Sequence, residues 1–599
     1  MYKTVLGICL SLFLSCASAN AAEPNLVSRA MYRGPVDLFL SEDESWAITV
    51  NEISGTVTLV DLATGSVRDE VAVGEKPGGL CHCSSDEFLV SSRFTGQVHR
   101  FGVRDGRLEQ LAKIEVGFEP LGIACHDNFA YVGLQATGEI AVLDLAKNEL
   151  SHRFAVGKWP RYLTISDGGD RLAVGLSGQS EIAVVSTETE EVLYEEPLSG
   201  GINIGHLELS NDGKQVYFPW MIYRTNPINV RNIQLGWVLA SRIARIRMDG
   251  PQYREAISLD VPRMAVADPF GIAKTPNEHR LAVTSSGTHE LLVYRLGDLP
   301  FIGTGGPGDL IDRRLMQDPD LFYRIELTGR PMGMEAASDN ETVYVANHLL
   351  DVIQEVNLES REVVREISLG PQPEETEEQT LHRGMAIFYD AERSLDQWYS
   401  CHSCHQDGGS NAKAMDTWND GTARSTKTVL PLAGVEHTAP WTWHGWQEDL
   451  DDSLQKSFVS TMQGKEASKE DLQALRAYLG SLEMPPNPFV ANPRDEAAVE
   501  RGKELFASSS VGCIDCHSGT RFTDGLKHDV GMIRDSDKYD SYNTPSLVGV
   551  YRKARWLHDG RAKTLAKVFE KWHRPDEIGG GAELTEQQIA DLVAYLKTL

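Results

Sequence analysis

The sequence predicts a multidomain protein: an all-β propeller of seven blades followed by two mainly α-helical domains. Three observations support this prediction. A repeat with a period of about 42 residues, the length of a four-stranded propeller blade, runs through residues 25–372. The composition then changes to segments with helical periodicity. Two copies of a Cys-x-x-Cys-His motif lie within this second part.

The chain begins like an exported protein. Lys3 precedes an apolar stretch over residues 4–14, and small residues follow at positions 17–22. Such a stretch is too short to cross a bilayer and is typical of a cleaved signal peptide. We therefore expect residues 1–21 to be removed and the mature protein to be periplasmic. The alternative is a lipoprotein with the lipid on Cys16.

The charge of the chain restricts its partners. The formal net charge is −29 at pH 7, which argues against binding to nucleic acid or to an anionic membrane surface. No segment after the signal is long and apolar enough to predict a membrane span. An acidic surface more often only keeps an exported protein soluble, although it can also attract a basic partner such as a small redox protein that donates or accepts electrons.

A recurring start signal defines the blades of the predicted propeller. Each start carries a proline or glycine turn, then a short strand, a polar turn and another strand. The seven starts lie at Pro35, Pro77, Pro120, Pro160, Gly205, Pro269 and Pro331. The final segment, 363–370, is expected to close the ring against the first blade. Longer spacings at 217–264 and 296–324 predict insertions that cover one face and pack against the helical region.

Three cysteines lie in the propeller, outside the two Cys-x-x-Cys-His motifs. In an oxidising compartment an odd number of cysteines allows one disulfide and one free thiol. Cys125 falls at a position in its repeat that matches Cys81 and Cys83 in the preceding repeat. We expect Cys125 to pair with one of these two.

Each Cys-x-x-Cys-His motif is the attachment signature of a c-type haem. The two cysteines bond covalently to the porphyrin, and the histidine binds the iron. The motifs place the attachment cysteines at Cys401, Cys404, Cys513 and Cys516, and the iron-binding histidines at His405 and His517. A zinc site would need the two pairs to converge, and a thiol redox pair has no need of the histidine. We therefore expect two covalently bound haem c groups.

The helical region is an internal duplication. Arg383-Gly384 and Arg501-Gly502 each precede one haem motif, and the stretch from Leu430 to Gly445 aligns without gaps with the stretch from Pro545 to Gly560. Helices are predicted over residues 380–390, 450–462, 469–482, 495–507, 564–573 and 585–599. Two cytochrome c domains follow, at residues 380–486 and 490–599, because helices must shield each porphyrin from water.

Residues 380–599 resemble the bacterial di-haem cytochrome c peroxidases and their MauG-like relatives. The resemblance rests on the order of the Arg-Gly, Cys-x-x-Cys-His and Ala-Pro-x-x-Trp stretches, followed in the second domain by Asn543-Thr-Pro-Ser-Leu and Leu557-His-Asp-Gly-Arg. The first part of the chain resembles the YVTN family of seven-bladed propellers. The resemblance implies peroxide reduction, or peroxide-driven oxidation of a substrate, at the first haem, with the second haem relaying electrons.

The resemblance also implies residue roles near the first haem. Trp443 stands where the family places a tryptophan between the haems; the alternative is packing beside the porphyrin. No histidine occurs in 411–422, so the first haem is expected to be five-coordinate. Cleavage of a peroxide bond needs a proton-transferring group. The candidates are the aligned residues Ser453 and Gln463, with His444, Glu448 and Asp449 as substitutes, while Met462 could instead bind the iron.

The second haem departs from the family at its sixth ligand. Trp572 stands at the expected position and cannot bind iron, so His573 and Met532 are the candidates, with His528 behind them. Histidine would lower the haem potential relative to methionine. Calcium between the domains is common in the family, but Ser425 replaces the expected asparagine. The alternative function is a pure electron-transfer di-haem cytochrome whose propeller is a protein-binding scaffold.

Overall fold

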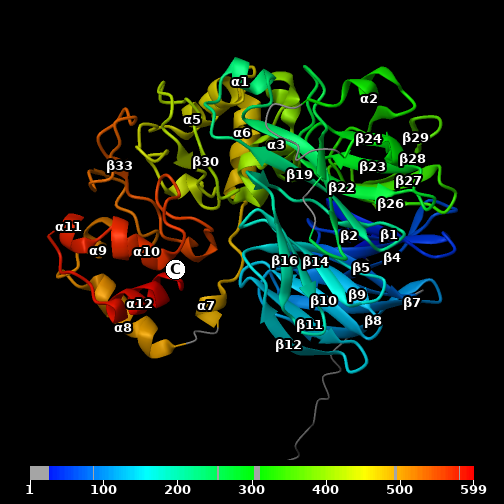
Figure 1. The fold of residues 1–599 in the computed structure, drawn as a ribbon, viewed down its shortest axis with the longest axis horizontal. Coiled ribbons are helices and arrows are strands. Elements are labelled where there is room, and N and C mark those ends of the chain that lie inside the picture. Colours follow the sequence, from blue (N-terminus) through cyan, green and yellow to red (C-terminus); the bar gives the residue numbers. More distant parts are fainter. Residues whose placement is uncertain (1–25, 85, 252–254, 302–309, 492–494, 579) are drawn as a thin grey trace, which may run out of the picture.

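The computed structural model describes residues 26–84, 86–251, 255–301, 310–491, 495–578 and 580–599. The predicted signal peptide, 1–21, lies outside these residues. Figure 1 shows a β-rich part, coloured blue to green, beside a helical part in yellow to red. Across the described ranges, no helix is long and apolar enough to cross a membrane.

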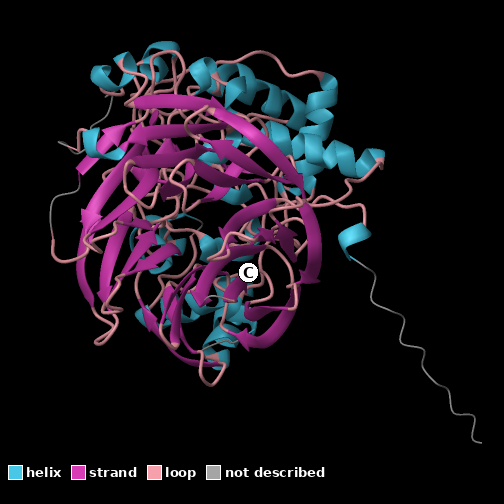
Figure 2. Cartoon of the chain, turned by 90° about the vertical axis from the view of Figure 1, so that its right-hand side faces the viewer, coloured by secondary structure: helices cyan, strands magenta, loops and turns pink. Residues whose placement is uncertain are grey.

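Seven antiparallel sheets follow one another along the first part of the chain, which confirms the seven-bladed propeller. In the turned view of Figure 2 its strands form one body, with several helices along the upper edge and others behind the strands. The first four blades comprise β1 (Pro35–Leu40), β2 (Trp46–Asn51), β3 (Thr56–Asp61) and β4 (Ser66–Ala72); β5 (Pro77–Ser84), β6 (Glu87–Ser92), β7 (Gln97–Arg104) and β8 (Arg107–Glu115); β9 (Pro120–His126), β10 (Phe129–Leu134), β11 (Glu139–Asp144) and β12 (Glu149–Ala155); and β13 (Pro160–Ile165), β14 (Arg171–Leu176), β15 (Glu181–Ser186) and β16 (Val192–Pro197).

The last three blades are less uniform, because the fifth sheet has five strands. They comprise β17 (Gly201–Ile202), β18 (Glu208–Leu209), β19 (Gln215–Tyr223), β20 (Leu239–Arg247) and β21 (Glu255–Ser258); β22 (Pro269–Lys274), β23 (Arg280–Ser285), β24 (Glu290–Arg295) and β25 (Phe322–Glu326); and β26 (Pro331–Ala336), β27 (Thr342–Asn347), β28 (Val352–Asn357) and β29 (Glu362–Ser368). Six of the seven predicted starts are the first residue of the innermost strand of a blade.

The ring closes differently from the expectation. Each blade is made of consecutive strands, so residues 362–368 form the outer strand of the seventh blade and pair with β28 rather than with the first blade. Closure comes instead from the segment before β1. The backbone N–H groups of Arg33 and Gly34 donate to Asp351 at 3.0 and 2.7 Å. The buried Arg33 side chain also pairs with Glu70 at 3.0 Å.

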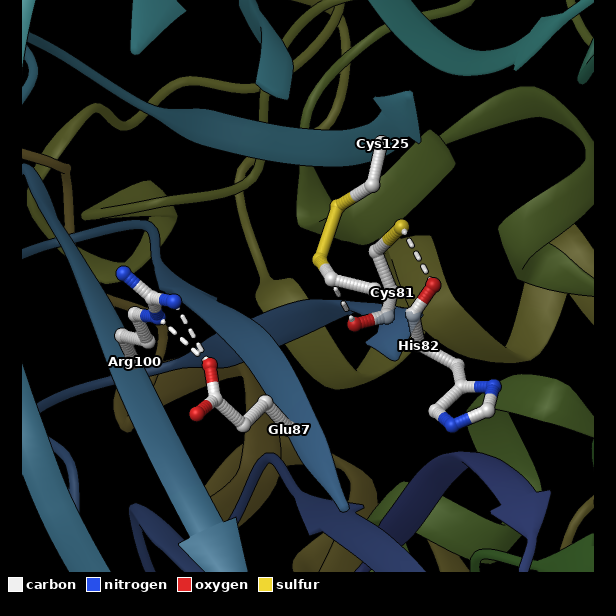
Figure 3. The surroundings of a disulfide bond; sticks show 6 residues. Cys81, His82, Glu87, Arg100 and Cys125 are labelled. Atoms are coloured by element: carbon white, nitrogen blue, oxygen red, sulfur yellow. Dashed lines mark hydrogen bonds and ion pairs between the residues drawn. A yellow bond between two sulfur atoms is a disulfide. The ribbon is translucent and has the colours of Figure 1, made fainter. Parts of the chain in front are cut away.

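Cys83 and Cys125 form the disulfide, and Cys81 keeps a free thiol beside them (Figure 3). The bond joins β5 of the second blade to β9 of the third. Burial raises the pKa of the Cys81 thiol to about 12, so the thiol stays protonated. The disulfide therefore links two neighbouring blades.

The helical region repeats one arrangement of elements. In the first half these are α3 (Thr376–Tyr389), α4 (Cys401–Cys404), α5 (Leu450–Lys456), the π-helical turn Ser457–Thr461 and α6 (Lys469–Gly480); α7 (Pro488–Ala491) connects to α8 (Glu496–Ala507), α9 (Cys513–Cys516), α10 (Leu565–Lys567), the π-helical turn Val568–Trp572, α11 (Pro575–Ile578) and α12 (Glu586–Leu596). The short strand pairs β30–β31 (Ala414–Met415, Lys427–Thr428) and β32–β33 (Lys527–His528, Tyr542–Asn543) complete the two halves.

Two glycines allow the helix pair of each half to pack closely. A Cβ atom at Gly384 of α3 would lie 1.9 Å from the carbonyl oxygen of Ala474 in α6. At Gly502 of α8 it would lie 2.0 Å from that of Asp591 in α12. Both approaches exclude any side chain, so these glycines fix the same helix crossing in both halves.

The first insertion of the propeller packs against the helical region as predicted. Tyr223 at the end of β19 donates its hydroxyl hydrogen to the carbonyl of Ala414, and the N–H of Ile228, ahead of α1 (Val230–Gln234), donates to Asp416 at 2.9 Å. The second insertion differs. Its described residues, which include α2 (Arg313–Gln317), pack mainly on the fifth and sixth blades through side chains such as Phe301.

Candidate haem sites

The first Cys-x-x-Cys-His motif forms a short helix with a fixed histidine. The helix α4 starts at Cys401. The backbone N–H of Ser400 donates a hydrogen bond to the hydroxyl oxygen of Ser403 at 3.0 Å. His405 follows directly, and its Nδ1–H donates to the carbonyl of Leu430 at 3.0 Å. Burial lowers the pKa of His405 to about 4, so the ring is neutral and its other nitrogen can bind a metal.

A propeller carboxylate holds this motif. The buried side chain of Asp268, just before β22, accepts hydrogen bonds from Ser400 at 2.5 Å and from Ser403 at 2.6 Å. Asn203, next to β17, donates to the carbonyl of Ser403 at 3.1 Å. All four side chains are buried. Because two blades bind the residues beside Cys401, the propeller is part of the first site.

Charged groups at the mouth of the propeller add a second contact. Asp407, two residues after His405, pairs with Arg161 at 2.9 Å and lies 3.8 Å from Arg93. Burial would raise the pKa of Asp407, but the two guanidinium groups outweigh it and hold this pKa well below its usual range. The segment that follows the first haem motif is thereby tied to the second and fourth blades.

A cavity of about 370 Å³ lies beside the first motif. This volume is within the range of small-molecule and cofactor sites. Its walls are mainly apolar and come from both halves of the helical region; they include Phe388, Cys401, Cys404, His405, Met415, Trp441, Trp443, Leu450, Phe458, Met462, Leu475, Leu479 and Val548. The two cysteines and a neutral histidine opening into an apolar cavity fit a covalently attached haem.

The four predicted catalytic residues separate into two groups. Trp443 and His444 line the cavity. Glu448 is exposed and lies outside the cavity wall. Gln463 also lies outside it, and its amide donates back to the carbonyl of Ser460 at 2.5 Å. The aligned residue Ser453 does reach the cavity.

Trp443 and His444 lie where the two halves of the helical region meet. The indole N–H of Trp443 donates to Thr428 at 2.8 Å, and its ring is 6.3 Å from that of His558 in the second half. The Nδ1–H of His444 donates to the carbonyl of Ser541 at 2.8 Å, and the ring stacks on Tyr542. Its Nε2 is buried and has no hydrogen-bond partner among the described residues. Both side chains therefore connect the first cavity to the second half.

The histidine of the second motif, His517, has another histidine ring near it. The Nδ1–H of His517 donates to the carbonyl of Phe522 at 3.0 Å. The ring of His573 lies 6.5 Å from that of His517, centroid to centroid. Two imidazoles on opposite sides of one iron should be about 6.4 Å apart, given metal–nitrogen bonds of about 2.0 Å and ring radii of about 1.2 Å. The observed separation fits an iron between the two rings.

The three candidates for the sixth ligand, His573, His528 and Met532, have different surroundings. Burial lowers the pKa of His573 to about 4, and its Nδ1 is buried without a hydrogen-bond partner in the described part of the chain. His528 instead pairs with Asp524 at 2.8 Å. Met532 lies in the loop between β32 and β33, where its carbonyl accepts a hydrogen bond from Tyr542. The geometry therefore favours His573.

The duplication shows what stands at the equivalent place in the first site. The helices α5 and α10 begin at matching residues, Leu450 and Leu565, each preceded by an isolated β-bridge. Counting from these starts, Phe458 corresponds to His573. Phe458 is buried, lines the cavity and cannot bind iron. Met462, 3 % exposed, lines the same cavity one helical turn later.

Comparisons with known proteins agree with this geometry. Residues 499–599 match the cytochrome c family. The hydrazine synthase subunit gamma of Kuenenia stuttgartiensis is 27 % identical over 269 residues, 36 % of this chain and 76 % of the relative. The methylamine utilization protein MauG of Methylorubrum extorquens is 22 % identical, covering 36 % and 76 %, and the cytochrome c551 peroxidase of Pseudomonas aeruginosa is 24 % identical, covering 37 % and 79 %.

Among solved structures, a chain of Kuenenia stuttgartiensis hydrazine synthase has a TM-score of 0.50 at 19 % identity, covering 56 % of this chain and 98 % of that one. This likeness shows the fold alone. Fold, motif and comparisons together define a multidomain c-type cytochrome with an N-terminal propeller. Its C-terminal region is homologous to haem oxidoreductases, the MauG and cytochrome c peroxidase proteins among them.

Proposed function

We propose that the protein is a periplasmic di-haem oxidoreductase of the peroxidase type. The proposal rests on a difference between the two sites in the residue that could bind the iron as a sixth ligand. His573 lies opposite His517, whereas Phe458 stands at the corresponding place in the first site. A site with a histidine on each side of the iron transfers electrons, and a site with one histidine can bind a small oxidant such as hydrogen peroxide.

A separate set of residues would hold the haem at each of the two sites. Cys401 and Cys404 hold the first haem c, and Cys513 and Cys516 hold the second. His405 binds the first iron, and His517 and His573 bind the second. The haem, when bound, supplies an iron that gains and loses single electrons and can coordinate a small oxygen compound. Apolar walls at the first site exclude bulk water from that position.

Trp443 is the proposed route for electrons between the sites. It lines the first cavity and lies 6.3 Å from His558 of the second half. The hydrogen bond to Thr428 holds the indole in place. A small redox protein would deliver the electrons to the second haem.

Proton transfer at the first site falls to His444 among the predicted candidates. Its Nε2 carries no hydrogen bond to any described residue, while Nδ1 keeps its proton on Ser541. Burial lowers the pKa of His444, so the ring is neutral and can accept a proton at Nε2. Glu448 and Gln463 lie outside the cavity, and we assign them no role.

The residues at Ser425 do not fit a calcium ion. The ammonium of Lys427 lies 2.7 Å from the Ser425 hydroxyl and 2.7 Å from the Asp537 carboxylate. A cation already occupies the place next to these oxygens, and a second one would be repelled. We therefore assign no calcium ion to the place beside Ser425.

A second candidate function rests on Met462. Its thioether lines the cavity that holds His405, and methionine is a known iron ligand in cytochromes c. With Met462 on the first iron, both haems would be six-coordinate and the protein would only transfer electrons.

Peroxide consumption by the reduced protein tests the proposal. We expect catalytic turnover with an artificial electron donor and binding of one carbon monoxide per reduced protein. Met462→Ala is the discriminating variant, because it opens the first iron only if the methionine binds it. Unchanged spectra and turnover in this variant support the proposed function. Absence of both peroxide turnover and carbon monoxide binding in the unaltered protein contradicts it.

A further inference from the structure

Two cations without a carboxylate partner line the first cavity. Lys553 follows the 3-10 turn Val550–Arg552, and Arg521 lies four residues after His517, so the second half of the helical region supplies both. Within the described ranges neither side chain forms an ion pair. Lys427, the other cation on this wall, is already paired with Asp537.

The surroundings of Lys553 give no counter-charge. Burial lowers its pKa to about 8, and no carboxylate opposes that effect. The nearest aromatic group is the ring of Trp443, 5.9 Å from the ammonium. A smaller cavity of about 70 Å³ shares Lys553 with the first one. Its two carboxylates are already paired, Glu119 with Arg552 at 2.9 Å and Asp407 with Arg161.

An unpaired ammonium facing an apolar cavity costs several kcal/mol unless an anion joins it. The haem expected at Cys401 and Cys404 would supply such anions, because it carries two propionate carboxylates. Two carboxylates and two free cations match in number and in sign, and lysine and arginine both bind carboxylates through charge-assisted hydrogen bonds.

We infer that Lys553 and Arg521 are the counter-ions of the two propionates of the first haem. The inference rests on the proposed attachment of that haem at Cys401 and Cys404. It makes the second half of the helical region a structural part of the first site. It also places a positive charge next to Trp443, on the proposed path between the haems.

A redox titration of the holoprotein, followed by visible spectroscopy, tests this assignment. A cation near the iron favours the reduced state, so Lys553→Met should lower the midpoint potential of the first haem. The ammonium also acts on His517 of the second motif, so the potential of the second haem should fall too, but by less than that of the first. Lys553→Arg keeps the charge and should restore most of the shift. Lys567→Met, which removes an exposed lysine of the same half, is the matched control and should change neither potential.

Arg521→Gln removes the other cation on a separate loop, and it keeps the test available if Lys553→Met does not accumulate. A lowered first-haem potential in either variant supports the inference. Potentials equal to those of Lys567→Met in both variants would overturn it. The titration involves no peroxide, so this result is independent of whether the protein turns peroxide over.

Discussion

Replacement of Asp268 by alanine should weaken the attachment of the first haem motif to the propeller. The aspartate accepts hydrogen bonds of 2.5 and 2.6 Å from Ser400 and Ser403, and all three side chains are buried. A hydrogen bond to a charged group contributes about 1.5–3 kcal/mol, and its loss leaves a buried hydroxyl without an acceptor. For two such bonds we expect a loss of about 4 kcal/mol in the free energy of unfolding. Asp268→Asn keeps one carbonyl acceptor and should lose about half as much.

Urea unfolding of the holoprotein, followed by circular dichroism and by haem absorbance, measures this effect. The matched control is Asp127→Ala, which removes a propeller carboxylate that is 83 % exposed. Asp127 and Asp268 both have a positive φ, 49° and 52°, where alanine is less favourable than aspartate, so the control should lose about 1 kcal/mol from this backbone strain alone. If Asp268→Ala loses no more stability than this control, the propeller does not hold the haem motif and our account of its role is wrong.

Three further predictions concern the haem sites and the disulfide. His573→Ala should convert the second haem from low spin to high spin in electron paramagnetic resonance (EPR) spectra, while Met532→Ala should leave it unchanged. Trp443→Phe should slow electron transfer between the haems by about tenfold, or about 1.4 kcal/mol in activation free energy, in rapid-mixing experiments; Trp441→Phe, in the same segment, should not. Cys83→Ser removes a bond that closes a separation of 42 residues and should cost about 4 kcal/mol of propeller stability, as should reduction of the unaltered protein.

Local patterns made much of the architecture predictable. The start signal before each blade depends on turn residues next to a strand, and six predicted starts begin an inner strand in the structure. The helix predicted over residues 469–482 is α6, Lys469–Gly480, because its apolar spacing and its cap at Ser468 lie within the segment itself. Such features need no knowledge of the rest of the chain.

The contacts between distant segments were not predictable in this way. Asp268 and Ser403 are 135 residues apart, and nothing near Asp268 distinguishes it from a turn residue. Likewise, nothing in the sequence distinguishes Lys553 from an ordinary surface lysine, and only the structure places it at the first cavity. Glu448 has suitable chemistry for proton transfer and Gln463 for hydrogen bonding to an oxidant, but whether a side chain faces the cavity depends on its packing. The choice of His573 over Met532 as the sixth ligand also depended on the distance between the His517 and His573 rings.

The central claim is that the two sites differ, with the first iron open and the second held between His517 and His573. An EPR spectrum of the oxidised protein tests this most directly. The account predicts one high-spin ferric signal from the first haem and one low-spin signal from the second. Two low-spin signals, with no high-spin component, would contradict it and would favour Met462 as a ligand of the first iron.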